Sequence, residues 1–292
     1  MLLSLSIVFV IKFVSLGFSM KNKDDLLNPY YIRDLLPLES RLLVPVIQVF
    51  DSTDSTNNIL MEKNCIYPNG HTCFAEEQTN ARGVSGNRWQ NVNKNICFSV
   101  AWNFKENSLN LHMLNFLVAI KLIEALDRIG YVGIQAKWPN DIIFEGFKIG
   151  GILIDIKFKK NSQIFVVLGV GINLELSSRD KKNIDQKASD LQSVDSKIKL
   201  DRNKFSAELL GAIIECLSQF EKYDYKKLSD EWNRIDYNFN KVKMIEVCNN
   251  EIIEVQIKGI NSNGQLCCLY KNKLNNYNFN EVKIIKDEIL RN

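Results

Sequence analysis

Three strand-like runs that follow one another closely constrain the fold of this 292-residue chain more than any other feature. They cover residues 141–144, 151–157 and 164–170, and each is rich in Ile, Leu, Val or Phe. Short turns separate them, and such turns join antiparallel neighbours, because a parallel pair needs a long crossover connection. The segment therefore predicts an antiparallel meander. Apolar runs at residues 72–75 and 96–102 predict two further strands.

Two amphipathic patterns predict helices that cover this sheet. Apolar side chains recur at steps of three and four residues between Met113 and Leu126, and the pattern stops at Gly130, a residue type that commonly ends helices. The same spacing recurs over residues 203–223. A helix with one apolar stripe must bury that stripe, so both segments are expected to pack on the sheet.

The chain changes character at about residue 238, where short β-rich runs alternate with turn signals at Asn249-Asn250 and Asn263-Gly264. These runs predict a small β-barrel. A unit of about 50 residues buries too little surface to be stable alone, so we expect it to pack against the main domain. The predicted division is an N-terminal apolar extension and lead-in at 1–40, a main domain at 41–237 and a C-terminal domain at 238–292.

Composition limits the chemistry that the chain can carry. Lys and Arg number 37 against 34 Asp and Glu, and a net charge of +3 is too small to predict binding to nucleic acid. The 2 histidines exclude a metal centre built from several of them and disfavour a histidine-based triad. The 7 cysteines are scattered without a C-x-x-C pair, which predicts reduced thiols and a cytoplasmic location.

The first 18 residues are apolar and leave two interpretations open. Their hydrophobicity is typical of a signal peptide or membrane anchor. However, the stretch lacks a positively charged start, Lys12 interrupts it and no A-x-A cleavage site follows. The alternative is an upstream extension or a misassigned start, with Met20 preceding the hydrophilic segment KNKDD.

The loop at residues 78–89 carries groups that suit an anionic ligand. Gly83 and Gly86 let the backbone approach a ligand closely. Arg82 and Arg88 suit a phosphate or carboxylate group, and Trp89 can stack on a base. The alternative is an exposed hairpin loop in which the arginines are solvated and the indole covers the core.

A second cluster, KWPND at residues 137–141, lies where a strand begins. Lys137, Asn140 and Asp141 suit a nucleoside triphosphate with Mg²⁺, because Mg²⁺ binds carboxylate and phosphate oxygens. Lys148 follows, just before Gly150-Gly151 and a predicted strand, so its ammonium would be fixed at the mouth of the sheet, where it can hold negative charge. The alternatives are a surface turn and an ordinary exposed lysine.

Together these three segments resemble biotin protein ligases. The similarity continues through Asp54-Ser55-Thr56-Asn57, the end of the run at 169–173, the helix start LDRNKF and the C-terminal β-rich segment, so it covers nearly everything from about residue 40. The resemblance implies an α/β (α+β) fold: a mixed, mostly antiparallel sheet with helices on one face, as in class II synthetases, followed by a small SH3-like β-barrel. It makes residues 41–237 the biotin- and ATP-binding ligase domain.

The same resemblance implies the reaction. Biotin would be joined to a lysine of a biotin carboxyl carrier protein, from acetyl-CoA carboxylase or a related carboxylase, through biotinyl-5'-AMP and with ATP and Mg²⁺ as cofactors. Lys148, the family's catalytic lysine, would neutralise the biotin carboxylate and the α-phosphate where charge builds up. Asp141 would either help the acceptor lysine lose its proton or bind Mg²⁺. Acceptor binding in this family often uses edge-strand pairing, and some members form homodimers.

The site residues that the resemblance implies fall into three sets. The catalytic set is Lys148, Arg82 and Asp141. The biotin-binding set is Ser55, Thr56, Asn57, Gln78, Ala81, Arg82, Gly83, Lys148, Gly150 and Gly151. The ATP-binding set is Arg82, Arg88, Trp89, Lys137, Asn140 and Asn173.

Several of these residues also have structural interpretations. Ser55 and Thr56 are expected to cap a helix. An earlier copy of their motif at residues 51–53 offers a second match, and we prefer the later copy because Asn57 follows it. Gly150-Gly151 would give a ligand room beside the backbone, or only form a hairpin turn. Asn173 would lie near the nucleotide phosphates, or only form a turn.

Three positions in the loop depart from the family pattern. Ala81, Val84 and Asn87 stand where one glycine and two arginines are usual. Fewer cations should hold an adenylate less tightly, unless Arg88 supplies the missing charge. The alternatives that stay open are a lipoate or octanoate ligase, a catalytically silent biotin- or adenylate-binding regulator, and a repressor. Residues 20–50 are too few for a winged helix-turn-helix, so no nucleic-acid partner is expected.

Overall fold

The computed structural model describes residues 26–62, 67–84, 89, 94–105, 110–159, 163–183, 187–199, 201–248 and 250–285. Among these, no helix combines the length and the apolar character that crossing a membrane requires. The apolar stretch at residues 1–18 lies outside the described residues, so its two interpretations stay open.

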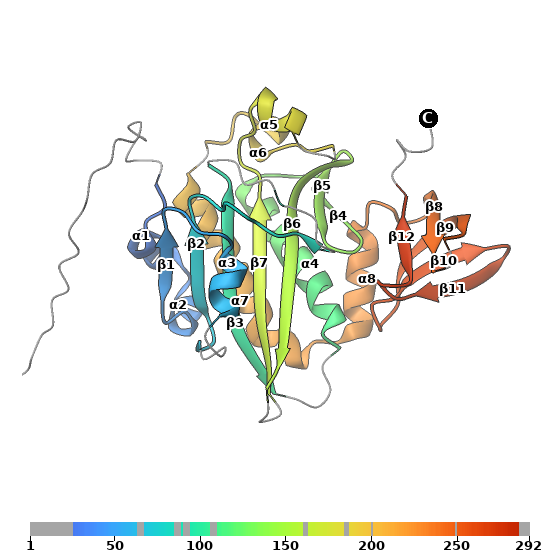
Figure 1. Ribbon diagram of the computed structural model, residues 1–292, viewed down its shortest axis with the longest axis horizontal. Coiled ribbons are helices and arrows are strands. Elements are labelled where there is room, and N and C mark those ends of the chain that lie inside the picture. Colours follow the sequence, from blue (N-terminus) through green and yellow to red (C-terminus); the bar gives the residue numbers. More distant parts are fainter. Residues whose placement is uncertain are drawn as a thin grey trace, which may run out of the picture.

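A seven-stranded sheet forms the centre of the molecule, in the order β1-β2-β3-β7-β6-β5-β4 (Figure 1). β1 pairs with β2 in parallel, and all other neighbours are antiparallel. The strands are β1 Ile47–Phe50, β2 His71–Ala75, β3 Ile96–Lys105, β4 Gln135–Lys137, β5 Asp141–Phe144, β6 Phe147–Phe158 and β7 Gln163–Ile172. The predicted meander is confirmed as β5, β6 and β7, and the two further predicted strands are β2 and β3.

Two long helices cover one face of this sheet, as predicted. α4, His112–Ile129, ends at Gly130, whose φ of 111° is left-handed and whose N–H donates to the carbonyls of Asp127 and Leu126. α7, Arg202–Gln219, begins where the Asp201 carboxylate accepts hydrogen bonds from two backbone N–H groups of its first turn, and the 3₁₀ turn η4, Phe220–Lys222, continues it. Figure 1 shows both helices behind the strands.

Alternation along β3 and β7 assigns their side chains to two faces. Val166, Leu168, Val170 and Ile172 point into the main core beneath α4 and α7, whereas Phe165 and Val167 point to the opposite face. There the short helix α3, Thr56–Met61, covers one end of the sheet. The same face also carries Cys97, Ser99, Gly151, Asp155, Gly169 and Gly171, and we call it the site face.

The remaining helices extend the core at its edges. α1, Pro29–Leu35, and α2, Leu38–Leu43, lie near α7, and Ile32 and Leu36 are buried in the main core. Part of the predicted lead-in at 1–40 therefore belongs to the packed structure. A buried ion pair of 2.7 Å joins Glu76, after β2, to Arg202 in α7. α5, Ser178–Asn183, and α6, Leu191–Val194, follow β7, and α8, Tyr225–Ile235, leads to the second sheet.

The second sheet is antiparallel, in the order β11-β10-β9-β8-β12. Its strands are β8 Val242–Val247, β9 Ile252–Ile260, β10 Leu266–Tyr270, β11 Lys273–Tyr277 and β12 Val282–Ile284. It contacts the main sheet's helices and loops as expected, because the Phe279 ring lies 5.7 Å from that of Trp138 and the turn at Gly264 lies against Phe116. Closure into an SH3-like barrel and the domain limits stay predictions.

The junction between the sheets contains a buried carboxyl group, on Asp236. Its Oδ1 accepts a hydrogen bond from the Asn238 N–H at 3.0 Å, and the side chain is 4% exposed. Burial raises the pKa of Asp236 to about 6. Because the folded state holds this proton more tightly than the unfolded state, the stability contribution is present below about pH 4 and is lost as the pH rises through about 6.

We therefore predict that Asp236→Asn changes how stability depends on pH. The free energy of unfolding of the mutant, relative to the native chain, should rise by up to about 3 kcal/mol between pH 4 and pH 7, since the amide cannot ionise. Urea unfolding at several pH values measures this difference. Asp230→Asn, at an exposed position of α8, is the control. A difference between Asp236→Asn and the native chain that does not vary with pH would contradict the prediction.

Candidate active site

A β-bulge places Lys148 on the site face. In the β5–β6 register, Ile142 pairs with Gly150 whereas Ile143 pairs with Lys148, so β6 has one extra residue, Ile149. The Ile149 side chain is fully buried in the main core. Lys148 and Gly151 consequently share a face although they are three residues apart, and a Cβ on Gly151 would lie 3.4 Å from Lys148 Nζ.

Lys148 and Asp141 form the ion pair at the centre of the site. Lys148 Nζ lies 2.5 Å from Asp141 Oδ1, and the two side chains are only 16% and 20% exposed. The backbone of Lys148 is also fixed, because its N–H donates to the Lys187 carbonyl and its carbonyl accepts from the Ser189 N–H. The predicted fixed lysine beside Asp141 is thus present, and the pair is held mostly out of water.

The Trp89 ring lies over this ion pair. Lys148 Nζ is 5.4 Å from the ring centroid, within the range of a cation–π interaction. A Cβ on Gly171 would come within 2.9 Å of the indole, and one on Gly151 within 3.4 Å. The absence of side chains on these two glycines therefore makes room for Trp89.

The Gly150-Gly151 pair also has a packing role. A Cβ on Gly150 would lie 2.5 Å from Ile172 Cδ1, a residue of the main core. Gly150 therefore gives room to core packing and Gly151 to Trp89. That the pair also gives a ligand room stays a prediction.

Ser55, Thr56 and Asn57 lie at the start of α3 and are each 3% exposed. The earlier copy of their motif begins with exposed residues, Asp51 and Ser52, so burial supports the later copy. The predicted hydroxyl cap is wrong, because Ser55 occupies the N-cap position without a side-chain cap hydrogen bond.

The Gln78 amide replaces the expected cap. Its Oε1 accepts a hydrogen bond from the Thr56 N–H at 2.8 Å and lies 3.2 Å from Thr56 Oγ1. A carboxamide 22 residues along the chain does what a local hydroxyl usually does. This contact fixes the start of the 78–89 loop against α3.

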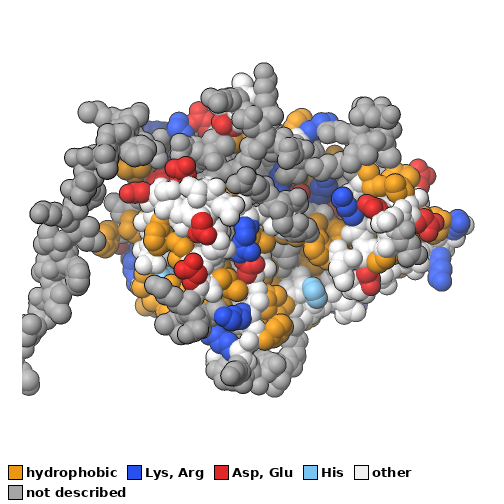
Figure 2. All heavy atoms as spheres, viewed as in Figure 1, with side chains coloured by type: hydrophobic (Ala, Val, Ile, Leu, Met, Phe, Trp, Pro, Cys, Tyr) orange, Lys and Arg blue, Asp and Glu red, His pale blue; other side chains and the backbone are white. Residues whose placement is uncertain are grey.

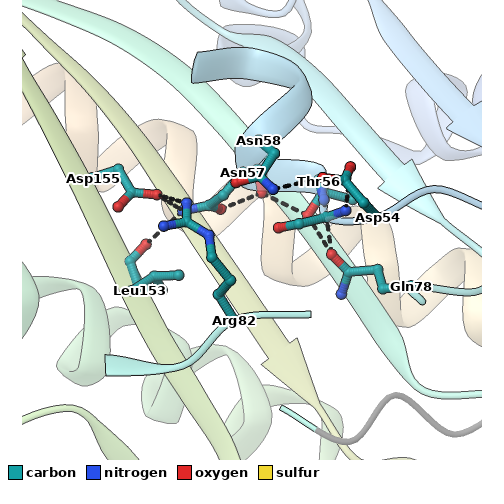
Figure 3. A network of polar contacts seen from close by, with 10 residues as sticks. Asp54, Thr56, Asn57, Asn58, Gln78, Arg82, Leu153 and Asp155 are labelled. Atoms are coloured by element: carbon teal, nitrogen blue, oxygen red, sulfur yellow. Dashed lines mark hydrogen bonds and ion pairs between the residues drawn. The ribbon is translucent and has the colours of Figure 1, made fainter. Parts of the chain in front are cut away.

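Arg82 reaches across the site face to Asp155 of β6 (Figure 3). Its guanidinium lies 2.6 Å from Asp155 Oδ2, which also accepts a hydrogen bond from Asn57 Nδ2 at 2.8 Å. Figure 2 shows basic and acidic side chains side by side in the middle of this face. Ala81, at a position where the family has glycine, is buried, and its carbonyl accepts from the Trp89 N–H. Arg88, Gly86 and Asn87 lie outside the described residues.

The residues expected to bind ATP have structural contacts of their own. Asn140 Nδ2 donates to the Ile152 carbonyl at 2.9 Å. Asn173 is buried, and its amide accepts from Asn95 Nδ2 and donates to the Ser189 carbonyl, both at 3.0 Å. Lys137 pairs with Asp141 in the β4–β5 ladder. Both asparagines thus support the loops at this end of the sheet, and their roles toward ATP stay predictions.

Sequence reasoning missed Asp155 and Ser99. Each is a polar residue with apolar neighbours on both sides in its strand, and Ser99 is completely buried. That pattern was visible in the sequence, but their partners come from α3 and the 78–89 loop and could not be read from it. Cys97 on the same face is unsuited to nucleophilic catalysis, because burial raises the pKa of its thiol to about 12.

The donors of the site fit a protein-held Mg²⁺ poorly. Among the residues that the structure describes, no three His, Cys, Asp or Glu side chains are grouped as a metal site requires. The predicted ligand, Asp141, already pairs with Lys148. We therefore derive no step through a metal.

Residues 49–173 match the sequence profile of the Biotin/lipoate A/B protein ligase family. This segment runs from β1 to the end of β7 and contains every site residue predicted above. The similarity to the biotin/lipoate A/B ligase family therefore covers the whole segment in which the site lies.

Within that family the similarity is to biotin protein ligases. The chain is 28% identical to the bifunctional ligase/repressor BirA of Escherichia coli over 251 residues, which are 86% of this chain and 75% of that protein. It is 24% identical to the biotin–[acetyl-CoA-carboxylase] ligase of Mycobacterium tuberculosis over 234 residues, 76% of this chain and 82% of that one.

Solved structures show the same fold. A biotin protein ligase from Aquifex aeolicus, in complex with biotin and ATP, superposes with a TM-score of 0.68 at 22% identity, covering 83% of this chain and 100% of that one. The biotin acetyl coenzyme A carboxylase synthetase of Helicobacter pylori gives a TM-score of 0.54 at 22% identity, covering 79% and 99%. The predicted fold class, a mostly antiparallel sheet with helices and a small C-terminal antiparallel sheet, is confirmed.

The glycines under Trp89 generate a prediction. Gly171→Ala would push its methyl group against the indole, so we expect the free energy of unfolding to fall by about 1–3 kcal/mol and the near-UV circular dichroism of the tryptophans to change. Chemical unfolding measures the first effect.

The control is Gly211→Ala within α7. An added Cβ there would meet Pro37 Cδ only at 3.4 Å, so stability should rise by up to about 1 kcal/mol through improved helix propensity. If Gly171→Ala were as well tolerated as Gly211→Ala, the contact between Gly171 and Trp89 would not be the reason for glycine at that position.

Proposed function

We propose that this protein uses ATP to attach biotin to a lysine of an acceptor protein. The observation that carries the proposal is the Lys148–Asp141 ion pair on the site face, under Trp89 and within the segment that matches the family. In the first step a biotin carboxylate oxygen attacks the α-phosphorus of ATP and pyrophosphate leaves. In the second step the acceptor amine attacks the carbonyl carbon of biotinyl-5'-AMP, and AMP leaves.

Lys148 supplies the positive charge that both steps need. Its ammonium is partly desolvated, so it stabilises the charge that develops on the α-phosphate more strongly than a solvated lysine would. Asp141 holds Lys148 in position and is the nearest carboxylate that can receive the proton from the acceptor amine. A Mg²⁺ that enters with ATP would be held mainly by phosphate oxygens.

The two ligands would occupy the two ends of the site face. The biotin ring would bind at α3, where Ser55, Thr56, Asn57 and Gln78 gather, and the 78–89 loop with Ala81, Arg82 and Gly83 would cover it. ATP would bind near Trp89, Lys137, Asn140 and Asn173, with Arg88. Lys148 lies between them, where the carboxylate and the α-phosphate must meet.

The acceptor would be the biotin carboxyl carrier domain of acetyl-CoA carboxylase or a related carboxylase, docked at the free edge of β6. Among the described residues, the part of β6 after Ile152 has a ladder partner only in β7. Ile156 and Phe158, on this part, are 41% and 73% exposed. An unpaired edge of this kind can accept a strand from an acceptor, or from a second copy of the chain in a homodimer.

We also propose that the protein acts in the cytoplasm. Six cysteines are described, all are free, and five of them are buried. Reduced thiols and use of ATP suit a reducing compartment.

The direct test is transfer of labelled biotin to a purified carrier domain. Lys148→Ala should lower the transfer rate at least about 100-fold, because it removes the charge at the reacting carboxylate. Lys204→Ala, at an exposed position in the first turn of α7, is the matched control and should keep the rate of the native chain. If Lys148→Ala transferred label as fast as Lys204→Ala, the assigned role of Lys148 would be wrong.

The same assay separates the alternatives. A lipoate ligase would load lipoate and leave biotin unused, and the family description covers both acids. A silent regulator would bind biotin but transfer none. A specific shift of an operator DNA by the purified protein would indicate a repressor.

A further inference from the structure

A continuous chain of polar contacts crosses the site face from Arg82 in the 78–89 loop to α3, and ends at Gln78, where the same loop begins (Figure 3). We call it the relay, and its members, in order, are Arg82, Asp155, Asn57, Ser99, Thr56 and Gln78. It joins four segments: the loop, β6, α3 and β3. The direction of each hydrogen bond in the relay follows from the chemistry of its members.

Asp155 sets the direction at one end. Its Oδ2 can only accept, and it receives hydrogen bonds from Arg82 at 2.6 Å and from Asn57 Nδ2 at 2.8 Å. The Asn57 amide must therefore turn its NH₂ group toward Asp155. Its oxygen then faces Ser99, whose Oγ lies 2.5 Å from Asn57 Oδ1.

The direction of the Ser99–Asn57 hydrogen bond determines the direction of the hydrogen bond between Ser99 and Thr56. An amide oxygen carries no proton, so the single hydroxyl proton of Ser99 is donated to Asn57. The contact of 2.7 Å between Ser99 Oγ and Thr56 Oγ1 must then use the proton of Thr56. The competing acceptor for that proton, Gln78 Oε1, is farther away at 3.2 Å and already accepts from the Thr56 N–H.

Thr56 Oγ1 consequently has no proton to donate to a ligand, and its lone pairs can only accept a hydrogen bond. We propose that Asp155 is a positioning residue that makes Thr56 a hydrogen-bond acceptor, so that the ring-binding site proposed at α3 selects a ligand ring that donates an N–H group. A cyclic urea has such a group, whereas a dithiolane ring has none. The same carboxylate binds Arg82, and so couples the loop to the residues proposed to bind the ring. The inference rests on the proposed function for the identity of the ligand.

A relay with only a structural role would affect ligand binding in a different way. Asn57 Oδ1 is so close to β7 that a Cβ on Gly169 would lie 2.2 Å from it, so the relay also holds α3 against the sheet. Loosening α3 would weaken the binding of all ring ligands alike. Loss of the hydrogen-bond direction would instead weaken only ligands that donate N–H.

The test measures the affinity of the full chain for biotin and for biotin methylated on a ureido nitrogen, by titration calorimetry. The native chain should prefer biotin about tenfold, the value of one hydrogen bond to a buried acceptor. In Asp155→Ala and in Ser99→Ala this preference should fall to about twofold or less. Asp155→Glu, which restores the carboxylate, should recover part of the preference.

Glu208→Ala is the matched control, because it removes a carboxylate from an ion pair with Arg128 outside the site and should leave the preference unchanged. The inference is overturned if the Asp155 and Ser99 variants bind both ligands more weakly by the same factor, or if their preference for biotin is unchanged. Either result leaves the proposed function intact, provided that the native chain transfers biotin. A native chain that binds no biotin overturns the proposed function itself. If Asp155→Ala fails to fold, the ligand preference of Ser99→Ala is the test of the inference.

Discussion

The bulge at Ile149 determines which side of the sheet Lys148 occupies. Without the extra residue, strict alternation along β6 would place Lys148 and Gly151 on opposite faces. With it, the ammonium lies against Asp141 and under Trp89, whereas Ile149 fills the core beneath α4. One backbone irregularity thus assigns a charged group to the ligand side and an apolar group to the core, and the chemistry proposed for the site depends on this assignment.

The site face is built from small residues for a related reason. β7 carries glycine at 169, where α3 lies against the strand, and at 171, so Asn57 of α3 and the Trp89 ring can approach the backbone. Large side chains there would fill the space that the polar residues of α3 and the 78–89 loop occupy. The opposite face of the same strand is continuously apolar under α4 and α7. A single strand therefore supplies both core packing and a floor for the site.

Local patterns in the sequence predicted most of the elements. The periodicity up to Gly130, the three runs of the meander and the helix start at Asp201 each depend on neighbouring residues, and each is present. The contacts of the site were less accessible, because they join distant segments: Gln78 caps α3 in place of Ser55, and Asp155 binds both Arg82 and Asn57. Spacing along the chain shows neither contact. The pairing of Asp141 with Lys148 was accessible because a short hairpin brings the two together.

A crystal structure of the protein with biotinyl-5'-AMP would show whether Lys148 reaches the reacting phosphate. We expect Lys148 Nζ to contact the phosphoryl group of the adenylate, with the ureido ring at α3 and Thr56 Oγ1 accepting from a ring N–H. An adenylate bound elsewhere, or one bound on the site face with Lys148 turned away from its phosphate, would contradict the account.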